Sequence, residues 1–137
     1  MDKRRFADES CVTDVLLEVC VTSLGSALAA QYGGADRIEL CDNLAVGGVT
    51  PSPAQLASVL HALSIPVHVL IRPRPGDFIY TAAEFAHMCR DIEHAHSAGA
   101  HGIASGVLLP GGRIDVPRTR ALVELARPMH FTFHRAF

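Results

Sequence analysis

Six side chains that could bind a metal, transfer a proton or hold an anion occur at alternate positions of short apolar segments. Alternate side chains of a β-strand point to opposite faces, so these six share one face and leave the other face apolar. Most of them lie toward the C-terminal end of their segment, which is the end at which parallel α/β folds carry their sites. They are Glu18, Cys20, Glu39, Cys41, Arg72 and His134. We expect them to converge on one mouth of the sheet.

The two thiols of this set could share one metal ion. Soft thiolate ligands favour Cu(I), and neighbouring strands lie about 4.8 Å apart, so we expect the sulfurs of Cys20 and Cys41 to come close together. Two cysteines separated by 20 residues carry no metal motif of their own. A buried cysteine is also most often a small apolar core residue.

The remaining members suit an enzyme. The carboxylates of Glu18 and Glu39 suit proton transfer, and His134 suits acid–base catalysis, while Arg72 or Arg135 could hold an anionic substrate. Such a set is typical of a lyase or isomerase that acts on a small anionic metabolite. The structural alternative is a paired polar layer inside a barrel, because proteins keep buried charges only when they have partners.

A further anion contact is expected in the loop 42–52, where Thr50 precedes a predicted helix whose free N–H groups could receive an anion. This loop and the loop 73–80 are longer and richer in Gly and Pro than a plain connection needs. The sequence contains no GxGxxG or Walker pattern, so a nucleotide is not indicated.

Short β-branched segments alternate with stretches of helical period along the chain. The strands are expected at 16–21, 37–41, 66–72, 101–108 and 130–137, and the helices from Ser23 to Gly33, Ser52 to Leu63, Thr81 to Ala98 and Val116 to Ala126. This alternation predicts repeated βα units with a parallel sheet. The strand starts imply about 28 residues per unit, so a complete (β/α)8 barrel would need about 230 residues. An open doubly wound sheet is the alternative for a chain of 137 residues.

Composition narrows the class of protein. The net charge of −2 comes from mixed signs without a basic block, which argues against nucleic acid as a partner. Residues 1–14 are polar and precede no long apolar run, so we interpret them as a flexible leader and expect neither a secretory signal nor a membrane anchor. The four cysteines show no CxxC spacing, which favours free thiols in the cytoplasm.

Several motifs together resemble the CutC family of copper homeostasis proteins. In chain order they are EVCV (18–21), GGADRIELC (33–41), GGVTPS (47–52), VHVLIRPR with GDFIY (67–80), GVL with GRID (106–115) and FTFHRAF (131–137). The resemblance implies a cytosolic (β/α)8 TIM-type barrel that self-associates and has a role in handling intracellular copper. The copper proposal for the family then falls on Cys20 and Cys41.

The resemblance also implies a chain that covers only part of the family's barrel. The family would continue through further βα units after FTFHRAF, so we expect residues 15–137 to form a partial CutC-type barrel truncated after about the fifth strand. Three interpretations of function follow: Cu(I) handling through the thiols at the mouth, an enzyme at the same mouth, or a truncated isoform that lacks full function.

Overall fold

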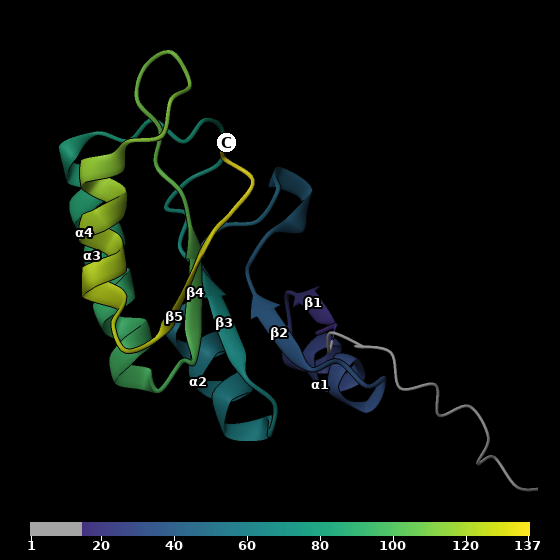
Figure 1. Cartoon of the computed structure of the whole chain (residues 1–137). Helices are drawn as coiled ribbons and strands as arrows, with labels where there is room; N and C mark the ends of the chain where they lie inside the picture. Colours follow the sequence, from purple (N-terminus) through teal and green to yellow (C-terminus); the bar gives the residue numbers. More distant parts are fainter. Residues whose placement is uncertain (1–14) are drawn as a thin grey trace, which may run out of the picture.

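Five short parallel strands alternate with helices in a computed structural model that describes residues 15–137 (Figure 1). The strands are β1 (Glu18–Val21), β2 (Arg37–Leu40), β3 (Val67–Leu70), β4 (Gly102–Ser105) and β5 (His130–Phe133). The helices are α1 (Leu24–Tyr32), the short 3-10 helix η1 (Leu44–Val46), α2 (Pro53–Ala62), α3 (Ala82–Ala98) and α4 (Val116–Ala126). The leader predicted at 1–14 lies outside the described residues.

The strands form one sheet in the order of the sequence, β1-β2-β3-β4-β5, and each neighbouring pair is parallel. An open doubly wound sheet would reverse this order at a switch point. Consecutive helices contact one another, α1 with α2, α2 with α3 and α3 with α4, so they follow the sheet around its outer side. The prediction of a partial (β/α) barrel with about five strands is confirmed.

Local side chains start each helix where the sequence predicts. Ser23, Ser52 and Thr81 accept hydrogen bonds from backbone N–H groups in the first turns of α1, α2 and α3. Asp115 caps α4 in the same way. These caps satisfy N–H groups that have no partner inside the helix. Within the described part of the chain, none of the helices has the length and apolar character needed to cross a membrane.

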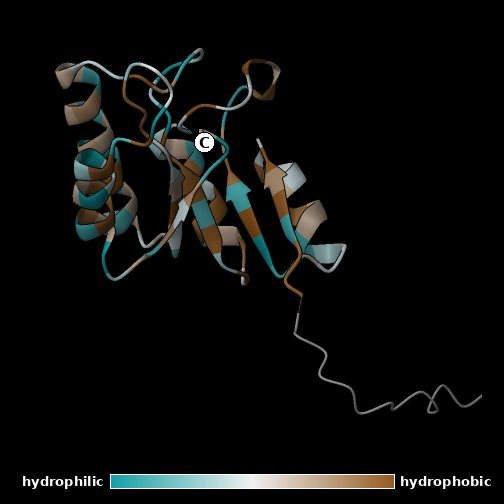
Figure 2. Ribbon diagram, turned by 45° about the horizontal axis from the view of Figure 1, so that its top comes forward, coloured by the Kyte–Doolittle hydropathy of each residue, from teal (hydrophilic) through white to brown (hydrophobic). Residues whose placement is uncertain are grey.

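The main core lies between the sheet and the helices. Its buried side chains come from the outer face of the strands and the inner faces of the helices: Ile38, Leu40, Val67, Val69, Ile71, Ile103, Leu56, Val59, Met88, Ile92 and Leu122. A smaller cluster of Cys41, Leu70 and Ala104 packs separately from this core. Single strands contain both hydrophobic and hydrophilic residues, as Figure 2 shows.

Several strands are shorter than the sequence predicts. The expected strand 130–137 ends at Phe133, and the expected strand 101–108 ends at Ser105. The ladder between them has four residue pairs, and one further hydrogen bond follows from His134 N to Ser105 O at 3.1 Å. The paired ladder ends there, so His134 and Arg135 lie in the segment that follows β5, with the His134 ring next to Gly106.

Candidate functional site

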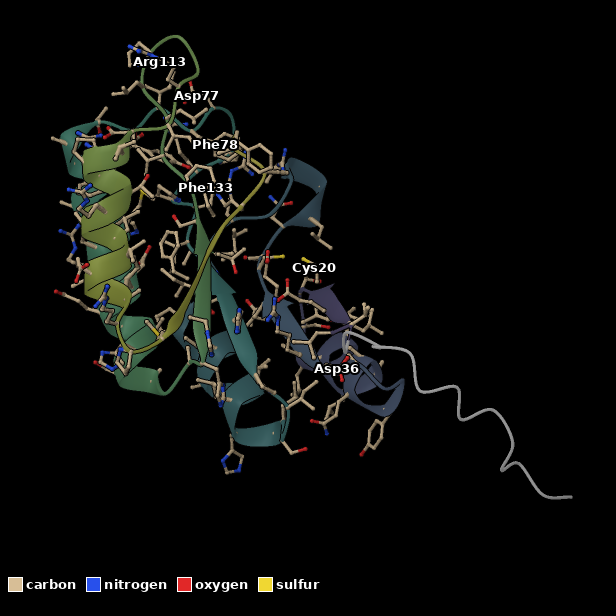
Figure 3. The ribbon with its side chains drawn as sticks, in the orientation of Figure 1. Cys20, Asp36, Asp77, Phe78, Arg113 and Phe133 are labelled. Atoms are coloured by element: carbon tan, nitrogen blue, oxygen red, sulfur yellow. The ribbon has the colours of Figure 1, made fainter. Side chains whose placement is uncertain are left out.

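Two cysteines meet at the carboxyl ends of the first two strands. Cys20 lies in β1 and Cys41 directly follows β2, and their Sγ atoms are 3.3 Å apart as free thiols. The strand register pairs Cys20 with Glu39, so Cys41 follows two residues later on the same face. Cys41 is fully buried, whereas Cys20, which Figure 3 labels, is exposed.

Burial raises the pKa of both thiols above the ordinary value, so both are protonated at neutral pH. It is the largest cause that raises the pKa of Cys41, to about 12, and the hydrogen bond to Cys20 adds to the effect. Burial also raises the pKa of Cys20, against the lowering effect of the hydrogen bond to Cys41. A thiol binds metal as the thiolate, so a metal ion at this pair has to displace protons.

A pocket of about 240 Å³ opens at the same end of the sheet. Its lining combines residues that follow strands with residues from two loops: Glu39, Gly47, Leu70, Arg72, Phe78, His134 and Arg135. The structure thus brings together four residues that the sequence singles out: Glu39, Arg72, His134 and Arg135.

Arg72 is buried in this lining and is held by backbone carbonyls. Its Nη1 donates to the carbonyls of Val46 at 2.9 Å and Gly48 at 2.7 Å, and its Nη2 donates to Gly76 O at 2.9 Å. The guanidinium also stacks on Phe78, with Cζ 5.2 Å from the ring centroid. Arg72 therefore fastens the loop 43–50 to the loop 73–79.

Thr50 supports Arg72 instead of lining the pocket. The backbone N–H of Arg72 donates to Thr50 Oγ1 at 2.9 Å, and Thr50 N donates to Arg72 O at 3.0 Å. Thr50 was expected to contact an anion, but it is absent from the residues that line the pocket. The helix that follows has its first turn capped by Ser52, which accepts from Gln55 N.

His134 and Arg135 enter the pocket from the turn after β5. Burial, with the positive charges of Arg135 and Arg72, lowers the pKa of His134 to about 4, so the ring is neutral at pH 7. Its Nδ1 accepts the N–H of Ala136 at 3.3 Å. Arg135 is exposed, and its Cζ lies 5.7 Å from the centroid of the Phe78 ring.

The two carboxylates that the sequence singles out, Glu39 and Glu18, differ in their position relative to the pocket. Glu39 lines the pocket, and burial followed by the negative charge of Glu18 raises its pKa, which suits a group that exchanges a proton. Glu18 does not reach the pocket: it forms an ion pair with Arg37 and lies 3.9 Å from Nδ1 of His68. The expectation that all six side chains meet at one mouth is therefore wrong for Glu18, because it begins β1 opposite Arg37 in the strand register. Cys20 and Cys41 lie at the carboxyl ends of their strands but are also absent from the residues that line the pocket.

Within residues 15–137, no group of three or more His, Cys, Asp or Glu side chains is arranged so that it could hold a metal ion. The thiol pair therefore offers two sulfur ligands and no third side chain of these types. Two soft ligands fit Cu(I) better than a hard cation, which needs several oxygen ligands.

The sequence model of the CutC family matches residues 15–137. The chain belongs to the CutC family. The resemblance of its motifs is thereby confirmed. Among curated CutC family proteins, that of Chromobacterium violaceum is 53% identical over 124 residues, which are 90% of this chain and 50% of the relative. That of Klebsiella pneumoniae is 48% identical over 122 residues, 89% of this chain and 49% of the relative. The chain spans about half the length of these CutC proteins.

Solved structures agree with the CutC fold. A protein from Streptococcus agalactiae described as a candidate copper homeostasis protein CutC superimposes with a TM-score of 0.82 at 34% identity, over 89% of this chain and 60% of that chain. A candidate phosphonomutase from Burkholderia cenocepacia superimposes with a TM-score of 0.57 at 23% identity, over 82% of this chain and 47% of that chain. The second likeness concerns the fold alone.

Gly47, Leu70 and Phe78 line the pocket but are absent from the sequence-based set. Leu70 shares the strand face of Arg72, so period-2 alternation could have included it. Gly47 and Phe78 lie in the Gly- and Pro-rich loops that the sequence marks as unusually long. Loop composition indicated the segments, while the residues that turn inward depend on the fold of each loop.

Proposed function

We propose that this CutC-family chain binds Cu(I) through Cys20 and Cys41 and serves the handling of copper in the cytoplasm. The observation that carries the proposal is the distance of 3.3 Å between the two free sulfurs. Thiolates select Cu(I), zinc and iron–sulfur clusters, and zinc sites use about four ligands, so a pair of sulfurs favours Cu(I). The exposure of Cys20 offers the ion a route to the buried Cys41. The likeness to the Streptococcus agalactiae protein, described as a candidate copper homeostasis protein, supports the proposal.

The test is a titration of the reduced chain with Cu(I) under anaerobic conditions, in competition with a coloured Cu(I) chelator. We expect about one tightly bound ion per chain, as for a two-thiolate site. The Cys20→Ser and Cys41→Ser variants should each lose this ion. Cys89→Ser is the matched control, because Cys89 is a free thiol of α3 outside the pair. Binding that survives in the double variant Cys20→Ser/Cys41→Ser would contradict the proposal.

A second candidate is an enzyme of the lyase or isomerase type that acts on a small anionic metabolite. It is favoured by the shared pocket of Glu39, Arg72 and His134. In this candidate Glu39 and His134 exchange protons with the substrate while the arginines hold its charge. The test is turnover of a panel of small carboxylates and phosphate esters. Glu39→Gln should lower turnover and leave Cu(I) affinity unchanged, and a lack of turnover across the panel would count against the candidate.

The chain spans about half the length of its curated relatives, so both assays should be run on this chain and on a full-length relative. Self-association and a cytoplasmic location are further parts of our proposal. Light scattering of the chain and of a full-length relative, together with cell fractionation, tests them.

A further inference from the structure

Two guanidinium groups share the pocket without a carboxylate partner. Within residues 15–137, neither Arg72 nor Arg135 forms an ion pair with an acidic side chain. We propose that this pocket binds a small ligand by an oxyanion head group, a carboxylate or a phosphate, which lies between Arg72 and Arg135 and receives a hydrogen bond from His134. This inference deepens the enzyme candidate above, since it names the class of its substrate.

Arg72 supplies a buried positive charge whose hydrogen-bond acceptors are all neutral carbonyls. Its side chain donates to three carbonyl oxygens and stacks on the Phe78 ring. The residue is 4% exposed, and its Nε has no hydrogen-bond partner among the described residues. A buried charge without an opposite charge is unfavourable, and a buried donor without a partner adds to the cost. An anion in the pocket would supply the missing opposite charge.

Arg135 brings a second positive charge to the same place. Both guanidiniums lie over Phe78, with Cζ atoms 5.2 Å and 5.7 Å from its centroid. Both also border Gly47: a Cβ there would fall against Arg135 Nη2 and would lie 3.2 Å from Arg72 Nη1. Like charges this close repel one another, whereas an oxyanion between them would be attracted to both guanidiniums.

His134 provides a third donor. Because Nδ1 accepts the N–H of Ala136, the neutral ring carries its proton on Nε2. In the described part of the chain Nε2 is buried and lacks a partner. Buried donors in folded proteins nearly always have an acceptor, so this N–H points to a ligand oxygen.

The volume of the pocket and its remaining lining residues indicate the size and charge of the ligand. The pocket volume of about 240 Å³ lies below the range of about 300–1,000 Å³ for drug-sized ligands, which suits a small metabolite. Leu70 and Phe78 provide apolar walls, and Glu39 is the one acid of the lining. A carboxylate accepts hydrogen bonds from a hydroxyl and repels a second anion. We therefore expect one anionic head and a short hydroxylated body.

The test is calorimetric titration of the reduced chain with glycerate, glycerol 3-phosphate and inorganic phosphate, and with glycerol as the neutral comparison. We expect saturable binding of at least one anion and none of glycerol. Tighter binding of glycerate would identify the head group as a carboxylate, and tighter binding of glycerol 3-phosphate would identify a phosphate. Either outcome supports the site.

Arg135→Gln should weaken the binding about tenfold or more, as expected for loss of a charged hydrogen bond. Arg113→Gln is the matched control: it removes the same charge at an exposed position in the loop before α4 (Figure 3), and Arg113 is not among the residues that line the pocket. Arg135→Lys should keep part of the affinity, because the charge remains.

Equal losses in Arg135→Gln and Arg113→Gln, or no saturable binding of any anion, would overturn the inference. These results would leave the copper proposal intact, since Cu(I) titration tests the thiols separately. Anion binding without turnover would support this site and count against the enzyme candidate alone.

Discussion

Gly47 is the position at which a single methyl group tests how the two arginines pack. The residue has φ 87° and ψ 10°, in the left-handed region. This backbone alone costs a non-glycine residue about 1–2 kcal/mol. The new Cβ would also displace Arg135 and crowd Arg72 Nη1 at 3.2 Å. Weakening one hydrogen bond of a charged group costs about 1.5–3 kcal/mol more.

We therefore expect Gly47→Ala to lower the free energy of unfolding by about 3 kcal/mol or more. Gly34→Ala is the matched control, because Gly34 has φ 93° and a Cβ there would meet no atom within 4 Å. It should cost only the backbone part, about 1–2 kcal/mol. Urea unfolding measures both values, and calorimetry should show weaker anion binding only in Gly47→Ala. Equal destabilisation of the two variants, with unchanged anion affinity, would refute the packing of both arginines against Gly47.

Three further predictions concern the same end of the sheet. The pKa of His134 is about 4 in the folded chain and about 6.5 in the unfolded chain. As the pH falls, the unfolded chain therefore binds this proton first. Stability should therefore fall between about pH 6.5 and pH 4 by up to about 3 kcal/mol, and urea unfolding of His134→Gln at both pH values should lack this part of the loss. Arg72→Met should lower stability by about 3 kcal/mol or more, because three carbonyls lose a charged donor; a change within about 0.5 kcal/mol, as at a plain surface position, would contradict the clamp. Glu39→Gln should speed the alkylation of Cys20 by iodoacetamide at pH 8, because Glu39 adds to the effect of burial in raising the pKa of that thiol. An unchanged alkylation rate would show that Glu39 does not act on Cys20.

Local patterns are sufficient to predict much of the architecture. The βα alternation, the caps Ser23, Ser52 and Thr81, and the end of α1 before Gly33 follow from the chemistry of neighbouring residues. Alternation with period 2 also assigned Cys20 and Cys41 to one face, and their sulfurs lie 3.3 Å apart. Such features depend on contacts within one turn of helix or one strand, so they can be read along the chain.

Position along the strand axis could not be predicted in this way. Glu18 and Glu39 share a face, yet the register places Glu18 opposite Arg37 at the start of β1, away from the pocket. Arg72 was expected to face the mouth, but the loops determine that its N–H groups bind the carbonyls of Val46, Gly48 and Gly76.

The composition of the pocket is likewise a result of packing between distant segments. Phe78 and Gly47 enter it from two loops, and His134 and Arg135 enter it from the turn after β5. Their charges act on one another only after the sheet has brought these segments together, and this proximity lowers the pKa of His134. A periodic pattern assigns a side chain to a face. Strand register and loop conformation determine its neighbours, because those contacts join residues far apart in the sequence.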